Sequence, residues 1–276
     1  MKVQLCLAAS VFSLSVAGTA WAQSCTPRVA AGSLVKPGTL VMSTNPTLPP
    51  MQFVNQQGEL KGMRVELGEE IAKRLCLKPE YIRIEFSAMI PGLQGGRWDM
   101  INTGIFFTDE RAKIMQMIPY ENQAISISAP KGNPTKITKP EDLAGKSVGV
   151  ELGGFEERKI KELAADLQKK GMPVPTIRTF DNFATAYQAL RAGQVEGVVS
   201  IDSVAKEYQD RGEFDRVLSG LFPTPVALAL KDKPLADAVA AVLNEMKKDG
   251  TYDKLFGRYG LGPFPTPTFA IKGPGQ

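Results

Sequence analysis

The chemistry open to this chain is narrow, because its 276 residues include no histidine. Without imidazole it cannot form a Ser-His-Asp or Cys-His catalytic group, and the usual zinc sites lose a common ligand. The only thiols are Cys6, Cys25 and Cys76, too few for a four-cysteine metal site. Any reaction must therefore depend on carboxylates, lysines or tyrosines, and we expect neither a metal ion nor a cofactor.

One short motif has the spacing of a catalytic loop but not its context. Gly145-Lys-Ser147-Val-Gly149 fits the Gly-x-Ser-x-Gly elbow of hydrolases, which needs a strand before the serine and a helix after it. Here the serine opens an expected strand, and no histidine can activate it. A phosphate-binding loop would need a glycine where Pro140 stands. We therefore expect no catalysis at Ser147.

The first 22 residues have the composition of a secretory signal. Lys2 precedes an apolar run over residues 3–17, and Ala20-Trp21-Ala22 supplies the small-x-small pattern that signal peptidase requires. No later stretch has the roughly 20 apolar residues of a membrane span. We therefore expect cleavage near Ala22 and a mature protein in the periplasm.

Two cysteines remain after such cleavage, Cys25 and Cys76. In an oxidising compartment a pair of cysteines is more often bonded than free, so we expect a disulfide between them. The alternative is two buried thiols. A lipoprotein signal with a lipid on Cys25 is a further alternative, although Ala22 stands where such signals have a larger apolar residue.

Charge and length favour a binding module over a nucleic-acid or membrane protein. The 33 Lys and Arg residues and the 29 Asp and Glu residues are interspersed, so no stripe of one sign is available for nucleic acid. The slightly basic total of +4 is consistent with an anionic or zwitterionic ligand. About 250 residues after the signal are enough for two domains of ordinary size.

Strands and helices alternate along the chain, which predicts parallel α/β layers. In the helix expected over residues 63–75, apolar residues recur every four positions, and Arg64 is among the charged residues expected to face water. Strands are further expected at 39–44, 81–86, 99–103, 146–150, 176–180, 195–200 and 226–230, and helices at 87–96, 155–170, 181–193 (with Asp181 as N-cap), 234–248 and 251–259. Residues 93–101 resemble residues 190–198, which indicates two lobes of similar plan. The Pro- and Gly-rich tail after Gly260 is expected to be extended or loose.

Several segments resemble the bacterial extracellular solute-binding proteins of family 3, the periplasmic receptors of polar amino-acid ABC importers. They are Thr44–Phe53 (TNPTLPPMQF), Gly58–Leu75 (GELKGMRVELGEEIAKRL), Ser87–Leu93 (SAMIPGL), Thr108–Ala112 (TDERA) and Asp249–Lys254 (DGTYDK). The resemblance implies a type II periplasmic-binding fold, an α/β fold of two lobes joined by a two-strand hinge, with the ligand cleft between them. Lobe 1 would cover 38–126 and 225–262 and lobe 2 would cover 127–224, with a signal at 1–22, an extension at 23–37 and a tail at 263–276.

The resemblance also implies roles for residues that match the family pattern. Arg111 matches the arginine that clamps the α-carboxylate of the ligand, as a planar guanidinium can. Phe86 matches an aromatic that stacks on the ligand, and Asn45 a position that often touches its side chain. Thr103 and Gly104 fall where backbone meets the carboxylate. The alternatives are a solvated arginine and a plain core phenylalanine.

Departures from the family pattern concern the polar partners of the ligand. Phe106 replaces a hydroxyl residue, and Gly153-Gly154-Phe155 replaces a Gly-Thr-Thr turn, so rings stand where hydroxyls are usual. The rings would enclose an apolar part of the ligand, unless both turn away into the lobes. Asp202 is the nearest candidate for the carboxylate that holds the ligand ammonium, although an ungapped alignment puts Ile201 there. Leu48 replaces a stacking tyrosine.

These features predict a monomeric receptor that captures a small carboxylate-bearing solute by hinge closure and passes it to a membrane-embedded ABC permease, without catalysis. The solute would be an amino acid or a derivative with an apolar or aromatic part. The alternative is a periplasmic enzyme similar to cyclohexadienyl dehydratases, with Glu151 or Glu156 as the acid, since burial raises the pKa of a carboxyl. A sensor lobe would need a membrane anchor and an output domain, which the sequence does not show.

Overall fold

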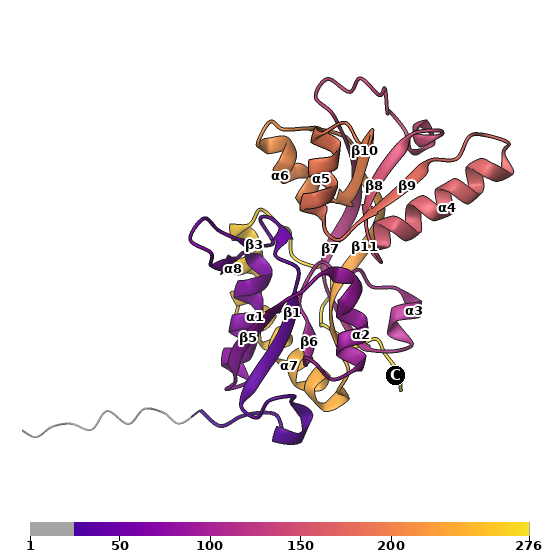
Figure 1. The fold of residues 1–276 in the computed structure, drawn as a ribbon. Helices are drawn as coiled ribbons and strands as arrows, with labels where there is room; N and C mark the ends of the chain where they lie inside the picture. The colour runs from indigo at the N-terminus through magenta and orange to yellow at the C-terminus, as the bar shows by residue number, and fades with distance from the viewer. Residues whose placement is uncertain (1–24, 276) are drawn as a thin grey trace, which may run out of the picture.

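Two lobes stacked end to end make up the protein, as Figure 1 shows for the computed structural model, which describes residues 25–275. The expected signal peptide, 1–22, lies outside these residues. Lobe 1 contains β1 (Thr39–Thr44), β5 (Lys78–Arg83), β6 (Met100–Ile101), α1 (Met63–Arg74), α2 (Met89–Gln94), α3 (Asp109–Ala112), α7 (Lys233–Lys248) and α8 (Thr251–Arg258). Lobe 2 contains β8 (Ser147–Glu151), β9 (Thr176–Phe180), β10 (Gly197–Ile201), α4 (Phe155–Lys169), α5 (Phe183–Arg191) and α6 (Asp202–Asp210).

One sheet of eight strands runs through both lobes in the order β5-β1-β6-β11-β7-β10-β8-β9. The pairs β1–β5, β1–β6, β8–β9 and β8–β10 are parallel, as the alternation of strands and helices predicts. The long strands β7 (Gln116–Ala129) and β11 (Asp215–Leu230) pair antiparallel and pass from one lobe into the other. Their register shifts repeatedly between Arg216 and Thr224, which gives the connection between the lobes an irregular ladder.

The helix α1 shows why a four-residue spacing of apolar side chains predicts a helix. Met63, Leu67 and Ile71 are fully buried on one face. The expectation that Arg64 faces water was wrong. Its side chain is completely buried, and Nη2 donates to both carboxylate oxygens of Glu121 at 2.9 Å. The sequence did not show that β7 brings this carboxylate under the helix.

Some boundaries and connections differ from the sequence-based expectations. The strand expected at 81–86 is β5, which begins and ends three residues earlier. Asn182, and not Asp181, caps α5, because its Oδ1 accepts a hydrogen bond from the backbone of Thr185 at 3.0 Å. A second sheet formed by β2 (Thr47–Leu48), β3 (Gln52–Val54) and β4 (Leu60–Lys61) was not predicted. The two-strand hinge was expected, but not the full length of β7 and β11.

The N-terminal extension is tied to lobe 1 by the expected disulfide. Cys25 and Cys76 are bonded, with their Cα atoms 5.5 Å apart, and this leaves no thiol at Cys25 for a lipid. Val29 and Leu34 pack into the core of the lobe. The Arg28 guanidinium adds an ion pair with Glu245 at 2.7 Å. The extension is therefore part of the folded lobe.

The C-terminal tail is extended but not loose, so that part of the expectation was wrong. Phe269 is buried, and its backbone N–H donates to Oδ1 of Asn244 in α7 at 2.7 Å. Further on, the backbones of Met117 and Lys272 exchange two hydrogen bonds of 2.7 and 2.9 Å. Within residues 25–275, no helix is long and apolar enough to cross a membrane.

Candidate functional site

The lobes contact each other where β1 and β6 of lobe 1 face β8 and β10 of lobe 2. Asn45, directly after β1, donates from Nδ2 to Oε1 of Glu151, the last residue of β8, at 2.8 Å. Next to this bond, the ring of Phe106 stacks on the ring of Phe155 with centroids 4.6 Å apart. All four side chains are buried, so the two lobes are closed against each other here.

Arg111 joins the two lobes at this contact. Its helix α3 begins after Thr108, whose hydroxyl accepts a hydrogen bond from the Arg111 N–H at 3.2 Å. The guanidinium donates to the carbonyl of Phe106 at 2.8 Å and to the carbonyl of Gly153, in lobe 2, at 3.3 Å. Its carbon lies 5.3 Å from the centre of the Phe86 ring. Because a guanidinium has five N–H groups, several remain to bind a carboxylate.

The electrostatics of the contact are set by Arg111 and by two buried glutamates of lobe 2. Burial lowers the pKa of Arg111 to about 10, and the charges of Glu156 and Glu151 oppose that effect. Burial also raises the pKa of Glu156 to about 7. For Glu151, burial and the neighbouring charges of Glu156 and Glu85 raise the pKa well above its ordinary value. The site therefore contains one strong cation and two acids that resist ionisation.

The other predicted site residues from lobe 1 lie around the same contact. Phe86 is buried in the cluster beneath α2. Thr103 is buried and its hydroxyl accepts a hydrogen bond from Nε2 of Gln52 at 2.7 Å. A Cβ added to Gly104 would lie 2.5 Å from Cδ1 of Ile201, so a larger residue would require this side chain to shift, and glycine allows the close approach of β10. Phe86 follows β5, and Thr103 and Gly104 lie between β6 and α3.

Gly154 and Phe155 form the lobe 2 side of the contact at the start of α4. Gly154 is the N-cap of this helix of 15 residues and carries no side chain. A Cβ at this position would lie 2.4 Å from Oε2 of Glu156, so the glutamate carboxyl occupies that space. Phe155 packs on Phe106. The two rings that stand where the family pattern has hydroxyl residues therefore contact each other.

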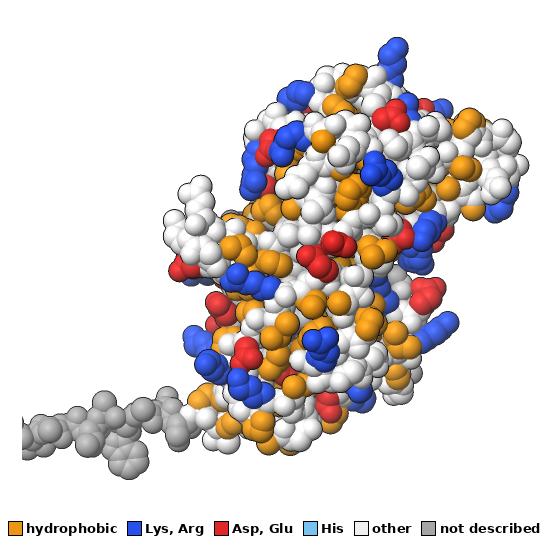
Figure 2. Space-filling model, in the orientation of Figure 1, with side chains coloured by type: hydrophobic (Ala, Val, Ile, Leu, Met, Phe, Trp, Pro, Cys, Tyr) orange, Lys and Arg blue, Asp and Glu red, His pale blue; other side chains and the backbone are white. Residues whose placement is uncertain are grey.

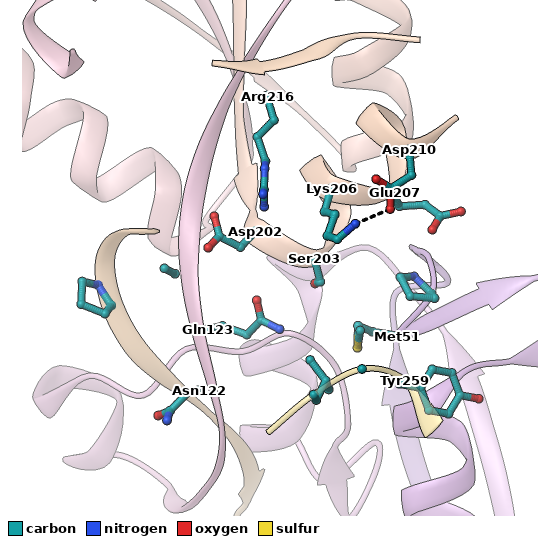
Figure 3. Close-up of a pocket in the computed structure, with 15 residues that line it drawn as sticks. Met51, Asn122, Gln123, Asp202, Ser203, Lys206, Glu207, Asp210, Arg216 and Tyr259 are labelled. Atoms are coloured by element: carbon teal, nitrogen blue, oxygen red, sulfur yellow. Dashed lines mark hydrogen bonds and ion pairs between the residues drawn. The ribbon is translucent and has the colours of Figure 1, made fainter. Parts of the chain in front are cut away.

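Asp202 is not in contact with this group and lines a separate cavity, which Figure 3 shows. It is the first residue of α6, and its carboxylate accepts hydrogen bonds from the hydroxyl of Ser126 and from the backbone of Gly220 at 3.2 Å. It lines a cavity of about 610 Å³ between α6, the connecting strands and lobe 1, together with Gln123 and Tyr259. The structure places Ile201, not Asp202, against Gly104.

A buried polar network supports the floor of the contact and was missed from the sequence. Gln52, whose amide holds Thr103, accepts a hydrogen bond from Arg64 Nη1 at 2.8 Å. The partner of Arg64, Glu121, accepts a further bond from Gln123 at 2.6 Å. These residues are spread over four segments (β3, α1, the turn after β6, and β7), and only their contacts in the fold relate them. The one available signal was Glu121, the single charged residue of β7.

The charges on the visible face of the molecule do not indicate a nucleic-acid site. Basic and acidic side chains are mixed over the face shown in Figure 2, without a stripe of one sign. Among residues 25–275, no group of three or more Cys, Asp or Glu side chains has the arrangement of a metal site. The lobe contact around Arg111 is therefore the candidate functional site.

Comparison with known proteins identifies relatives over most of the chain. An L-cystine-binding protein of Escherichia coli (strain K12) is 31% identical over 228 residues, which cover 79% of this chain and 81% of that protein. The lysine/arginine/ornithine-binding periplasmic protein of the same organism is 28% identical over 239 residues, which cover 81% of this chain and 88% of that protein.

Solved structures share the architecture. An ancestral arginine-binding protein bound to arginine has a TM-score of 0.74 and 35% identity, and the match covers 80% of this chain and 98% of that one. The ancestral amino acid-binding protein AncCDT-1, a precursor of cyclohexadienyl dehydratase, has a TM-score of 0.72 and 32% identity. The match covers 80% of this chain and 95% of that one. The model of the bacterial extracellular solute-binding proteins, family 3, matches residues 40–262, so this chain belongs to that family.

Proposed function

We propose that this protein captures a small carboxylate-bearing solute, an amino acid or a derivative with an apolar or aromatic part, between its lobes. The observation that carries the proposal is Arg111, which bonds to backbone of both lobes and keeps N–H groups for a ligand. A carboxylate held there would add charge-assisted bonds between the lobes and so favour closure. The relatives that bind cystine, arginine or lysine support an amino-acid ligand.

The remaining residues of the site would enclose the ligand. Phe86 and at least one of Phe106 and Phe155 would contact its apolar part. Asn45 would contact its polar part, and backbone at Thr103, Gly104 and Gly154 would contact its carboxylate. Gly154 stands at the N-terminus of α4, where free N–H groups and the helix dipole favour an anion.

The lobes would move about a hinge in the two long strands. We place lobe 1 at 38–126 and 225–262 and lobe 2 at 127–224, because the connection between the lobes consists of β7 and β11. The protein would act as a monomer in the periplasm after cleavage near Ala22, and would deliver its ligand to a membrane-embedded ABC permease. The periplasmic relatives support this location.

The test begins with a thermal-shift screen of the mature protein against amino acids, opines, aromatic acids and quaternary amines. A ligand at 100 times its Kd stabilises the fold by about 2.7 kcal/mol. Calorimetry with the ligand found should then show that Arg111→Ala weakens binding at least about tenfold, since bonds to charged groups contribute about 1.5–3 kcal/mol. Arg111→Lys should restore little, because the two-pronged geometry is lost. Unchanged affinity in Arg111→Ala would contradict the proposal.

An enzyme on the same scaffold is the second candidate, and one observation favours it. Glu156 is buried beside Arg111 with a pKa of about 7, which suits a general acid near neutral pH. A structural relative, AncCDT-1, is an ancestral amino acid-binding protein and a precursor of cyclohexadienyl dehydratase. We expect binding without turnover. Incubation with prephenate and arogenate, followed by product analysis, decides between the two, since steady turnover of either would favour the enzyme.

A further inference from the structure

Five acidic side chains are buried in the described part of the chain, and three of them are well partnered. Asp99 accepts two backbone N–H bonds of 2.7 Å, and Glu121 pairs with a buried arginine. Glu157 accepts a backbone N–H at 2.7 Å and a lysine ammonium at 2.5 Å. Glu151 and Glu156 differ from these three. Neither forms an ion pair with another described residue, although both are more than nine-tenths buried.

The few bonds of these two glutamates all lie inside the lobe contact. Glu151 accepts one neutral bond, from the Asn45 amide of the opposite lobe, at 2.8 Å. Glu156 is bonded to its own backbone N–H. Its carboxyl takes the space that a Cβ at position 154 would fill. Arg111 is the cation that acts on both carboxyls, and it forms an ion pair with neither. A buried carboxylate is costly without a close positive partner, so one cation at this contact is shared by two acids.

Asp202 does not share this demand. Its carboxylate already accepts bonds from Ser126 and Gly220, and it lies in the cavity beside the connecting strands. The position opposite Gly104 is taken by Ile201, an apolar side chain. A ligand cation at the lobe contact would therefore meet Glu151 and Glu156 before it could reach Asp202.

We propose that Glu151 and Glu156 hold the cationic groups of the ligand while Arg111 holds its carboxylate, so that the protein prefers amino acids of net positive charge. This inference rests on the proposed function. If all three side chains are ionised, the site has one positive and two negative charges. A ligand with one carboxylate and two cationic groups matches every charge, whereas a neutral zwitterion leaves one buried carboxylate unpaired.

Binding of such a ligand should be coupled to loss of protons. A nearby cation favours the ionised carboxylate, and the Glu156 pKa of about 7 means that its proton must be released on binding at lower pH. The charged groups that act on these glutamates are Arg111 and, for Glu151, Glu85. The charges of Glu110 and Arg158 also act on Arg111. We expect the affinity for L-arginine to rise at least about tenfold between pH 5.5 and pH 8.

The experiment is calorimetry on the mature protein, unfolded and refolded to remove bound solutes, with L-arginine, L-ornithine, L-lysine and L-glutamine. At least one basic amino acid should bind tenfold or more tightly than L-glutamine. Glu151→Gln and Glu156→Gln should each weaken that binding at least about tenfold, and Glu156→Gln should flatten its pH profile. The matched control Asp202→Asn should change affinity less than about twofold. Circular dichroism of each variant checks that it is folded.

The outcomes separate this inference from the function on which it rests. Tighter binding of L-glutamine than of every basic amino acid overturns the charge assignment and leaves an amino-acid receptor. A large loss in Asp202→Asn with none in Glu156→Gln overturns the choice of residues. Binding of none of the four amino acids at either pH overturns the inference together with the proposed amino-acid ligand, and the wider thermal-shift screen then decides the ligand class.

Discussion

Glu156 should make the ligand-free protein less stable as the pH rises. Burial disfavours the ionised form of this side chain, and it raises the pKa from the ordinary value of 4.5 to about 7 in the folded protein. Between these values the folded state binds more protons than the unfolded state, so the free energy of unfolding falls with rising pH. A tenfold difference between the proton dissociation constants of the folded and unfolded states corresponds to about 1.36 kcal/mol. The free energy of unfolding therefore falls by about 3 kcal/mol by pH 8. Glu151 acts in the same direction, since its pKa is also raised.

Chemical unfolding of ligand-free protein at pH 4.5, 6, 7 and 8 tests this expectation, with wild type and Glu156→Gln compared at each pH. The variant cannot ionise at this position, so it should gain up to about 3 kcal/mol on the wild type between pH 4.5 and pH 8. Glu162→Gln is the matched control on the same helix. Glu162 is half exposed and pairs with Lys159, so its replacement should leave the difference from wild type nearly constant. A wild type and Glu156→Gln that change in parallel over this range would refute the reasoning.

Three further predictions concern the scaffold and the rings. Glu121→Gln should cost about 3–5 kcal/mol of unfolding free energy, because it leaves Arg64 buried and unpaired. Asp237→Asn, at the surface pair with Lys233, is the control and should cost under about 1 kcal/mol. Denaturant titration measures both, and a loss below about 1 kcal/mol in Glu121→Gln contradicts the expectation. Replacing both Cys25 and Cys76 by serine should cost about 4 kcal/mol, because the disulfide joins residues 51 apart in sequence, and equal stability with and without the bond would count against it. Phe106→Ser with Phe155→Thr should weaken the native solute and improve binding of polar amino acids by calorimetry, and the opposite order would show that the rings do not select the ligand.

Local patterns were sufficient where one segment determines the structure. The apolar spacing of α1 and the continuous apolar run of β1 depend only on neighbouring residues, and the structure confirms both. The disulfide could also be predicted, because only two cysteines follow the signal and the compartment favours their pairing. The position of Arg64 in α1 was predicted wrongly, because its partner, Glu121, lies 57 residues away on strand β7. The tail was misjudged for the same reason, since it is fixed by distant residues of β7 and α7.

The site could be predicted in part, and what could not be predicted is the direction in which side chains point. The family pattern named Arg111, Asn45, Phe106 and Phe155, which the structure brings to one contact between the lobes. Asp202 was chosen because it follows a strand of lobe 2 and carries the right charge. At the end of a strand, successive side chains point to opposite faces, so a one-residue difference decides which side chain faces lobe 1. Ile201 takes that direction, and Asp202 turns towards β7 and β11.

The departures from the family turn become one feature when they are considered together. Compared with the Gly-Thr-Thr turn of the family pattern, Gly154 and Phe155 each lack a hydroxyl group. Considered one at a time, these changes indicate a ligand whose polar group forms fewer hydrogen bonds. In the fold, the carboxyl of Glu156 occupies the space that a side chain at 154 would fill. A larger residue at 154 would require this carboxyl to shift, so glycine here leaves room for an acid at the contact. The turn has exchanged neutral hydroxyl donors for a carboxylate acceptor, and an acceptor of negative charge selects for a cationic ligand group.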